Sequence, residues 1–178
     1  MDAIDLLREQ TKGAWDWLES ILADVTEEQA NWQPGGTANS ITAGYAHLVV
    51  TADNGFNTQL KGQMPIIATE FKGQVGLSEP FNASGGWRDR STVRADWEAL
   101  RKFGRAVYQE VIRHVDAATP EDLERRVDMT PWGLEVWTGL EIFTLHGINH
   151  PRLHGGEFAC LKGLQGSEGY TQASRAYR

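Results

Sequence analysis

Three of the five histidines lie in one short stretch, as His146, His150 and His154, each four residues from the next. Residues four apart on a helix share a face, so each neighbouring pair can direct two imidazoles at one point. Neutral imidazoles are common ligands of divalent metal ions. His146 and His154 are about 12 Å apart along a helix axis, too far to share an ion readily. The spacing therefore predicts two ligands, either 146 with 150 or 150 with 154.

A third ligand must come from another element, and His47 is the only histidine in the first half of the chain. Facing helices of a bundle can project ligands into a common centre. Three histidine nitrogens leave a fourth coordination position open to water or substrate, which is typical of a catalytic metal site. The alternative interpretation is that these histidines are unrelated polar residues on half-buried helix faces.

Pro151 lies within the histidine stretch and bears on its geometry. Proline has no N–H and clashes with the carbonyl four residues back, so we expect a kink or a restart of the helix. It also biases His150 away from helical dihedral angles. Gly155 and Gly156, just after His154, either loosen the helix or let another group approach closely.

The composition limits the class of protein. A chain of 178 residues with 40% hydrophobic and 23% charged residues fits one globular domain. The net charge of −7 argues against a nucleic-acid surface and gives no reason to expect an anionic membrane as partner. Cys160 is the only cysteine, which excludes a disulfide framework and a cysteine-based zinc site. With no signal peptide or membrane-spanning run in the sequence, we expect a cytoplasmic protein.

Hydrophobic periodicity predicts an all-α protein with four long helices, at about 3–23, 41–60, 92–115 and 138–163. The residues expected to cap the last three are Ser40, then Ser91 or Thr92, and Thr138 with Glu141. Gly163 is expected to end the fourth helix. Shorter signals predict helical turns after Thr26 and Thr119, and a short hairpin within 125–137.

The segment 61–90 contains five glycines and two prolines without sustained periodicity. A connection of this length suits a crossover between helices that are not antiparallel neighbours, so we expect a four-helix bundle with one long crossover. The bundle is expected to form a single domain over 1–163. Residues 164–178, rich in Gly, Ser and Gln, are expected to pack loosely as a tail.

Three other residues with chemical potential have structural interpretations. We expect Asp53 on the surface or in a local hydrogen bond, His114 as a cation near a helix C-terminus, and Cys160 as a small buried apolar residue. Six tryptophans fall into two groups. Core positions are expected for Trp15, Trp97 and Trp137. Loop positions that line a pocket mouth or a dimer contact are expected for Trp32, Trp87 and Trp132.

Two stretches resemble the DinB-like (YfiT-type) family of four-helix-bundle proteins. The first comprises Thr26-Glu-Glu-Gln-Ala-Asn-Trp32-Gln-Pro34-Gly-Gly, Asn39-Ser-Ile41 and Ala46-His47-Leu48. It is similar to the family's acidic turn, Trp and Pro-Gly loop, Asn-Ser-Ile cap and His-Leu pair. The second, His146-Gly-Ile-Asn-His150-Pro-Arg-Leu-His154-Gly-Gly156-Glu157, resembles the family's last-helix pattern of His, His-x-x-x-His and x-Gly-Gln. The order of elements is similar from residue 1 to 163.

The resemblance implies an up-down-down-up bundle whose metal ligands are His47, His150 and His154, with His146 outside the set. Glu157 stands where the family more often has Gln, and either orients His154 or is solvated. The implied ion is divalent, with zinc first and nickel, iron or manganese as alternatives, because imidazoles suit several metals.

The resemblance also implies a class of activity. Family members include transferases and isomerases that use low-molecular-weight thiols, and metal-dependent hydrolases, so we expect a small-molecule substrate such as a thiol. The alternative is a metal- or small-ligand-binding stress-response protein without turnover. A homodimer is implied as well. Neither the substrate nor any catalytic residue beyond the ligands is indicated.

Overall fold

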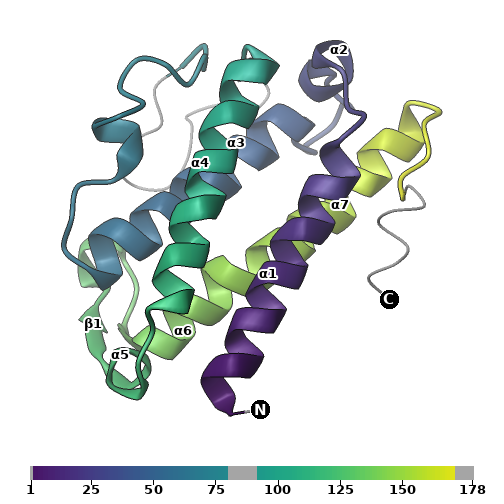
Figure 1. Cartoon of the computed structure of the whole chain (residues 1–178). Coiled ribbons are helices and arrows are strands. Elements are labelled where there is room, and N and C mark those ends of the chain that lie inside the picture. Colours follow the sequence, from purple (N-terminus) through teal and green to yellow (C-terminus); the bar gives the residue numbers. More distant parts are fainter. Residues whose placement is uncertain (1, 80–91, 171–178) are drawn as a thin grey trace.

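Four long helical segments run up, down, down and up in the computed structural model, which describes residues 2–79 and 92–170 (Figure 1). The first is α1 (Ala3–Leu22), and the second is α3 (Ile41–Asp53) continued by the π-helical η1 (Asn54–Leu60). The third is α4 (Trp97–Asp116). The fourth joins α6 (Gly139–Thr144), the π-helical η4 (Leu145–Asn149) and α7 (His150–Leu164). The predicted all-α four-helix bundle is confirmed.

Short elements connect the long ones, namely α2 (Glu27–Asn31), η2 (Ile66–Ala68), α5 (Pro120–Glu124), β1 (Arg126–Asp128), η3 (Thr130–Trp132) and β2 (Val136–Thr138). The strands β1 and β2 form the predicted hairpin, with Val127 opposite Trp137. Four predicted caps are present, since the side chains of Thr26, Ser40, Thr119 and Thr138 each accept a backbone hydrogen bond from three residues on. Among the described helices, none combines the length and apolar character needed to cross a membrane.

The third helix begins later than predicted, at Trp97, and its N-cap is Asp96, whose side chain accepts from the Ala99 N–H. Thr92 is therefore not the cap, and Ser91 lies outside the described residues. Ala95 is held in an extended bridge opposite Leu77, and its N–H donates to Asn31. These contacts come from distant parts of the chain, so the helical periodicity of the apolar residues did not reveal them.

The fourth segment ends one residue beyond Gly163, and the left-handed conformation is adopted by Gly166, with φ of 80°. The residues that follow pack on the bundle. Ser167 Oγ accepts from Gln29 Nε2 at 2.7 Å, and the Tyr170 ring stacks on Trp17. Residues 171–178 lie outside the described residues, so the division into a bundle at 1–163 and a tail at 164–178 stays a prediction.

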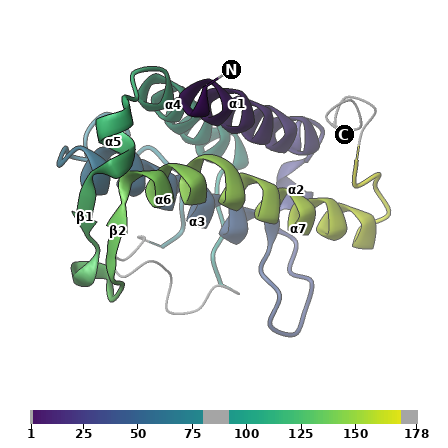
Figure 2. The same ribbon diagram turned by 90° about the horizontal axis from the view of Figure 1, so that it is seen from below.

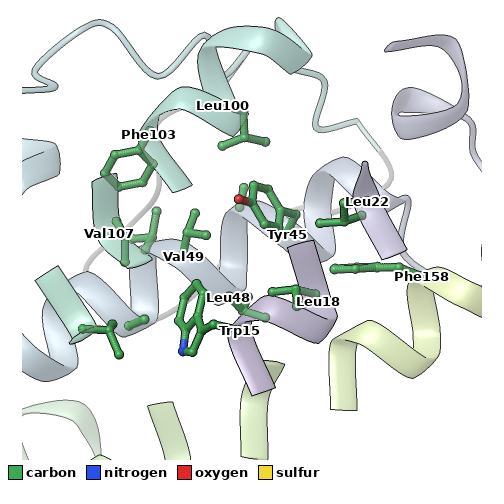
Figure 3. Close-up of a cluster of buried hydrophobic side chains, with 14 of the residues drawn as sticks. Trp15, Leu18, Leu22, Tyr45, Leu48, Val49, Leu100, Phe103, Val107 and Phe158 are labelled. Carbon is green, nitrogen blue, oxygen red and sulfur yellow. The ribbon is translucent and has the colours of Figure 1, made fainter. Parts of the chain in front are cut away.

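The core lies between the four long segments, and α1, α3, α4 and α7 all contribute to it (Figure 3). Trp15 and Trp97 are buried, as predicted, and Trp137 is half-buried against the core. The labelled core residues come from every long segment, namely Trp15, Leu18, Leu22, Tyr45, Leu48, Val49, Leu100, Phe103, Val107 and Phe158. The face of α3 that carries His47 is thereby held against α7.

Asp53 fixes the start of the crossover from inside the bundle. It is only 1% exposed, so of the two expectations the surface position was wrong, and the local hydrogen bond is present, from Asn57 four residues on. Its carboxylate accepts hydrogen bonds from the Ile66 and Ile67 N–H groups and from Asn57 Nδ2, all at 2.8–2.9 Å. Burial raises the pKa of Asp53, and these three hydrogen bonds oppose that shift.

His114 belongs to the same buried chain of hydrogen bonds. Its Nε2 lies 3.0 Å from Asn57 Oδ1, and since the Asn57 amide donates to Asp53, His114 donates from Nε2. The ring is 3% exposed and stacks on Phe56. Burial, and then the charge of Arg113, lowers the pKa of His114 to about 4. The residue is neutral at pH 7, so the expected cation at the helix end was wrong.

A pH-dependent loss of stability follows from this shift. The unfolded chain binds a proton at His114 near pH 6.5, and the folded chain binds it only near pH 4, so stability is lost as the pH falls between these values. His114→Gln keeps an N–H donor for Asn57 but cannot titrate. In metal-free protein, we expect this variant to reduce the slope of unfolding free energy against pH by about 1.4 kcal/mol per pH unit between about pH 4.5 and 6.

Urea titrations at several pH values measure this difference. Asp53 acts in the opposite direction, because its raised pKa lets the folded state take up a proton first, but it is present in both proteins. Parallel pH profiles for the wild type and His114→Gln would contradict the assignment of a neutral, buried His114.

Candidate metal centre

His47, His150 and His154 form a cluster between α3 and α7. The ring centroids of His47 and His150 are 5.7 Å apart, and the other two pairs are each 5.6 Å apart. Each ring therefore contacts both others in a nearly equilateral triangle. Ser40 sets the start of α3, and His47 lies half-buried two turns later among buried neighbours.

Pro151 does not displace His150 from the helix. His150 has φ −57° and ψ −51°, which are α-helical values, and the fourth segment forms a continuous rod in Figure 2. Of the two expectations, a kink or a restart, the restart is observed, because α7 begins at His150 with Pro151 in its first turn, directly after η4. The His150 N–H donates to the Leu145 carbonyl, five residues back, in place of the usual four. This change of hydrogen-bond register accommodates the missing N–H and the ring of Pro151.

The triangle of rings has about the size that a shared ion requires. A metal bound to an imidazole nitrogen at about 2.1 Å lies about 3.2 Å from the centroid of that ring. Two rings bound to the same ion, with a tetrahedral angle at the metal, therefore have centroids about 5.2 Å apart. The observed separations are 5.6 and 5.7 Å. Even so, no group of three or more His, Cys, Asp or Glu side chains in the described ranges has the arrangement that would hold a metal ion.

The protonation state of His150 suits a ligand. Burial, followed by the charge of His154, lowers the pKa of His150 to about 4, so the ring is neutral at pH 7. Its Nδ1 is covered and has no hydrogen-bond partner among the described residues. A buried polar nitrogen without a partner is unfavourable, and a coordinated cation would satisfy it.

Glu157 contacts His154 directly. Its Oε2 lies 2.7 Å from His154 Nδ1, although the Glu157 side chain remains 60% exposed. Of the two alternatives for Glu157, the hydrogen-bonded one is observed. A proton held on Nδ1 by this carboxylate leaves Nε2 of His154 with its lone pair available to a ligand.

Glu157→Gln tests this contact. Gln has the same size and can accept from Nδ1, but it removes the negative charge that raises the basicity of the imidazole. If the cluster binds zinc, its affinity should fall about 10-fold in this variant, which is the lower end of the effect of losing such a partner. Competition with a chromophoric chelator measures the change. An unchanged affinity would show that the carboxylate is merely solvated.

His146 lies beside the triangle, with its ring 5.4 Å from that of His150. The ring is buried on the backbone of η1, where a Cβ at Gly55 would approach His146 Cδ2 to 2.3 Å. Burial, and then the charges of His150 and His47, lowers the pKa of His146 to about 3. Sequence reasoning missed Gly55, and the available signal was a glycine inside an apolar helical pattern.

The remaining candidates lie elsewhere. Asp53 and His114 serve the crossover, as described above. Cys160 is exposed on α7, so its expected role as a small buried residue was wrong. Trp132 is partly exposed beside the hairpin, and Trp87 lies outside the described residues.

The fold and the cluster together define an up-down-down-up helical bundle with a histidine group between its second and fourth segments. The family model of the DinB superfamily matches residues 10–158, and the chain belongs to this superfamily. A similar solved structure is that of a conserved protein from Enterococcus faecalis, with 20% sequence identity and a TM-score of 0.74. The match covers 92% of this chain and 97% of that chain, and concerns the fold alone. No curated protein matches the sequence.

Proposed function

We propose that the protein binds one divalent metal ion through His47, His150 and His154 and uses it in a reaction of a small molecule, of the thiol-transferase or hydrolase type. The observation that carries the proposal is the triangle of imidazole rings, with all three centroid separations within 0.1 Å of one another. Membership of the DinB superfamily is consistent with it.

The described side chains form no ready metal-binding arrangement, so the proposal requires the imidazole rings to turn when the ion binds. Rotation of an imidazole about its side-chain torsions moves its nitrogens by roughly an ångström or more without moving the helix. Rotation about the Cβ–Cγ bond leaves each ring centroid nearly in place, so the triangle can persist while the nitrogens turn toward a common centre. On this proposal, a bound ion draws the three rings into their final orientation.

Zinc is the first choice of ion, with nickel, iron and manganese as alternatives, because imidazole ligands suit several of these metals. When bound, the ion supplies an open coordination position that favours a thiolate or a hydroxide at neutral pH. The chain's own residues prepare the site. Burial keeps His150 unprotonated, and Glu157 orients His154 through Nδ1.

The direct test uses protein purified without a nickel column or a histidine tag. We expect metal analysis to find about one divalent ion per chain, or zinc titration of chelator-treated protein to restore one site. Bound zinc should also raise the unfolding temperature, because it binds the folded state. Protein that contains no metal and takes up none on titration would contradict the proposal.

A non-catalytic metal-binding protein is the second candidate. It is favoured by the structural roles of Asp53 and His114, whose hydrogen bonds hold them away from the cluster. Glu157, the carboxylate that contacts the cluster, is hydrogen-bonded to His154. A screen of thiol-transfer and hydrolysis substrates with the zinc-loaded protein separates the two. Turnover that disappears on chelation supports the enzyme, and binding without turnover supports the second candidate.

Two further features belong to the proposal: a homodimer and a cytoplasmic location. The family resemblance is what supports the dimer. Light scattering after size exclusion measures its mass, and a monomer at micromolar concentrations would contradict it.

A further inference from the structure

An open cavity lies at the hairpin end of the bundle, away from the histidine cluster. It offers about 460 Å³ of space that is widely open to solvent, a volume within the range of small-molecule sites. Its walls come from the end of η1, the start of the hairpin and η3, and the lining residues are Thr58, Gln59, Leu60, Lys61, Gly62, Arg125, Arg126, Val127, Asp128, Pro131 and Trp132. Thr58 follows His47 by 11 residues, roughly 16 Å along a helix, so the two sites are separate.

One wall of this cavity is apolar and held in a fixed position. Trp132 is 36% exposed and is carried on η3, whose last turn is closed by Gly133 with φ of 76°. The start of η3 is fixed by Asp128, whose carboxylate accepts from both the N–H and the hydroxyl of Thr130 at 2.9 and 2.7 Å. An exposed indole held by such a turn offers a flat surface to an aromatic or apolar group.

The cavity lining also carries positive charge, in a chain whose net charge is −7. Lys61, Arg125 and Arg126 line the cavity, against one carboxylate, Asp128, which is already bonded to Thr130. Arg125 Nη1 donates to the Leu60 carbonyl at 2.7 Å, which fixes one guanidinium at the wall. Lys61 pairs with Asp122 at 2.9 Å, so the two arginines supply the remaining positive charge of the lining. Arg126 also interacts electrostatically with Glu141, which does not line the cavity. Arginine donors match the two oxygens of a carboxylate.

We propose that this cavity binds a small organic anion in which a carboxylate is attached to a flat apolar body. The carboxylate bonds to the Arg126 and Arg125 guanidinium groups, and the flat body packs on Trp132. Thr58 also lines the cavity, and its hydroxyl oxygen is covered and has no hydrogen-bond partner among the described residues. Rotation of this side chain gives the anion a further donor.

The test uses 2-naphthoate as the probe and 2-naphthylmethanol as its neutral analogue. The indole N–H resonance of Trp132 is assigned by its loss in Trp132→Phe. We expect 2-naphthoate to shift this resonance saturably at concentrations up to about 5 mM, and the alcohol to leave it unchanged. Arg126→Gln should weaken the binding about fivefold, because a charge-assisted hydrogen bond is lost.

Arg105→Gln is the matched control, since Arg105 is an exposed arginine of α4 that does not line the cavity. It should bind 2-naphthoate like the wild type. Three results would overturn the proposal: no shift of the Trp132 resonance, an equal response to the alcohol, or equal affinities in Arg126→Gln and Arg105→Gln. Binding that is lost in His154→Ala would place the anion at the histidine cluster and would also overturn it.

Discussion

His154→Ala is expected to lose tight zinc binding, with an affinity more than roughly 100-fold below that of the wild type. The change removes one of three imidazoles and leaves two, which hold a divalent ion far less firmly in water. The effect should exceed that of Glu157→Gln, because Glu157 acts on the ion only through His154. Competition with a chromophoric chelator measures both variants on one scale. Any metal-dependent turnover should disappear together with the ion.

His146→Asn is the matched control for His154→Ala. Both residues are four positions from His150, and both rings contact it, at 5.4 and 5.6 Å. If the ligands are His150 and His154, the Asn variant keeps zinc affinity close to that of the wild type. If His146→Asn lost zinc binding and His154→Ala kept it, the ligands on this helix would be His146 and His150. Circular dichroism and urea unfolding show whether either variant has lost its fold.

Much of the framework could be predicted from the sequence because its signals are local. The cap of α3 depends on a hydrogen bond between Ser40 and the N–H of Ala43, three residues on, so side-chain chemistry alone specifies it. The long helices follow from apolar periodicity. The histidine cluster required more than this, because spacing left two pairs equally possible. The choice of His150 and His154 came from the family resemblance.

Two of the errors, at Asp53 and at the start of α4, have a different cause, which is contact between distant parts of the chain. Asp53 appears to be a surface residue until the backbone of η2 supplies two N–H donors to it. The start of α4 moves to Trp97 because Ala95 is bound by Asn31. Neither partner can be read from a local pattern.

Pro151 shows the same limit in a single helix. The rules for proline assume the α-helical hydrogen-bond register, and under that register they predict a kink or a restart of the helix. The η4 segment uses a bond to the fifth residue back, which removes the conflict. Two glycines accompany this wider turn, since Gly147 lies against Thr11 and Gly55 lies under the His146 ring. The packing of α1 and η1 around the turn selects a register that propensity does not indicate.

Gly104→Ala is expected to destabilise the fold by about 3 kcal/mol, at the upper end of the usual cost of overpacking. Gly104 is where α4 passes closest to Tyr45 of α3, and an added Cβ would lie 2.0 Å from the Tyr45 hydroxyl oxygen. Tyr45 cannot easily move away. It is fully buried, and its hydroxyl lies between Glu19 at 3.3 Å and Arg101 at 3.4 Å.

The pair formed by Arg101 and Glu19 makes this site still less tolerant. Two guanidinium nitrogens donate to the two carboxylate oxygens at 2.9 and 2.8 Å, and the guanidinium also lies over the Tyr45 ring. Any shift of Tyr45 therefore disturbs a largely buried ion pair, which is costly to break. Because Tyr45 and His47 lie on the same helix, a shift of α3 that relieves this clash should also disturb the histidine cluster and weaken zinc binding.

Gly13→Ala is the control for the Gly104 prediction, since Gly13 lies within α1 and an added Cβ there meets no atom within 4 Å. That change should stabilise the protein by about 0.5–1 kcal/mol, because alanine favours the helix and restricts the unfolded chain. Urea unfolding of the three proteins at one pH measures both effects. If both variants shifted stability in the same direction and by similar amounts, glycine's helix propensity would explain both, and the close contact between α3 and α4 would have no energetic role.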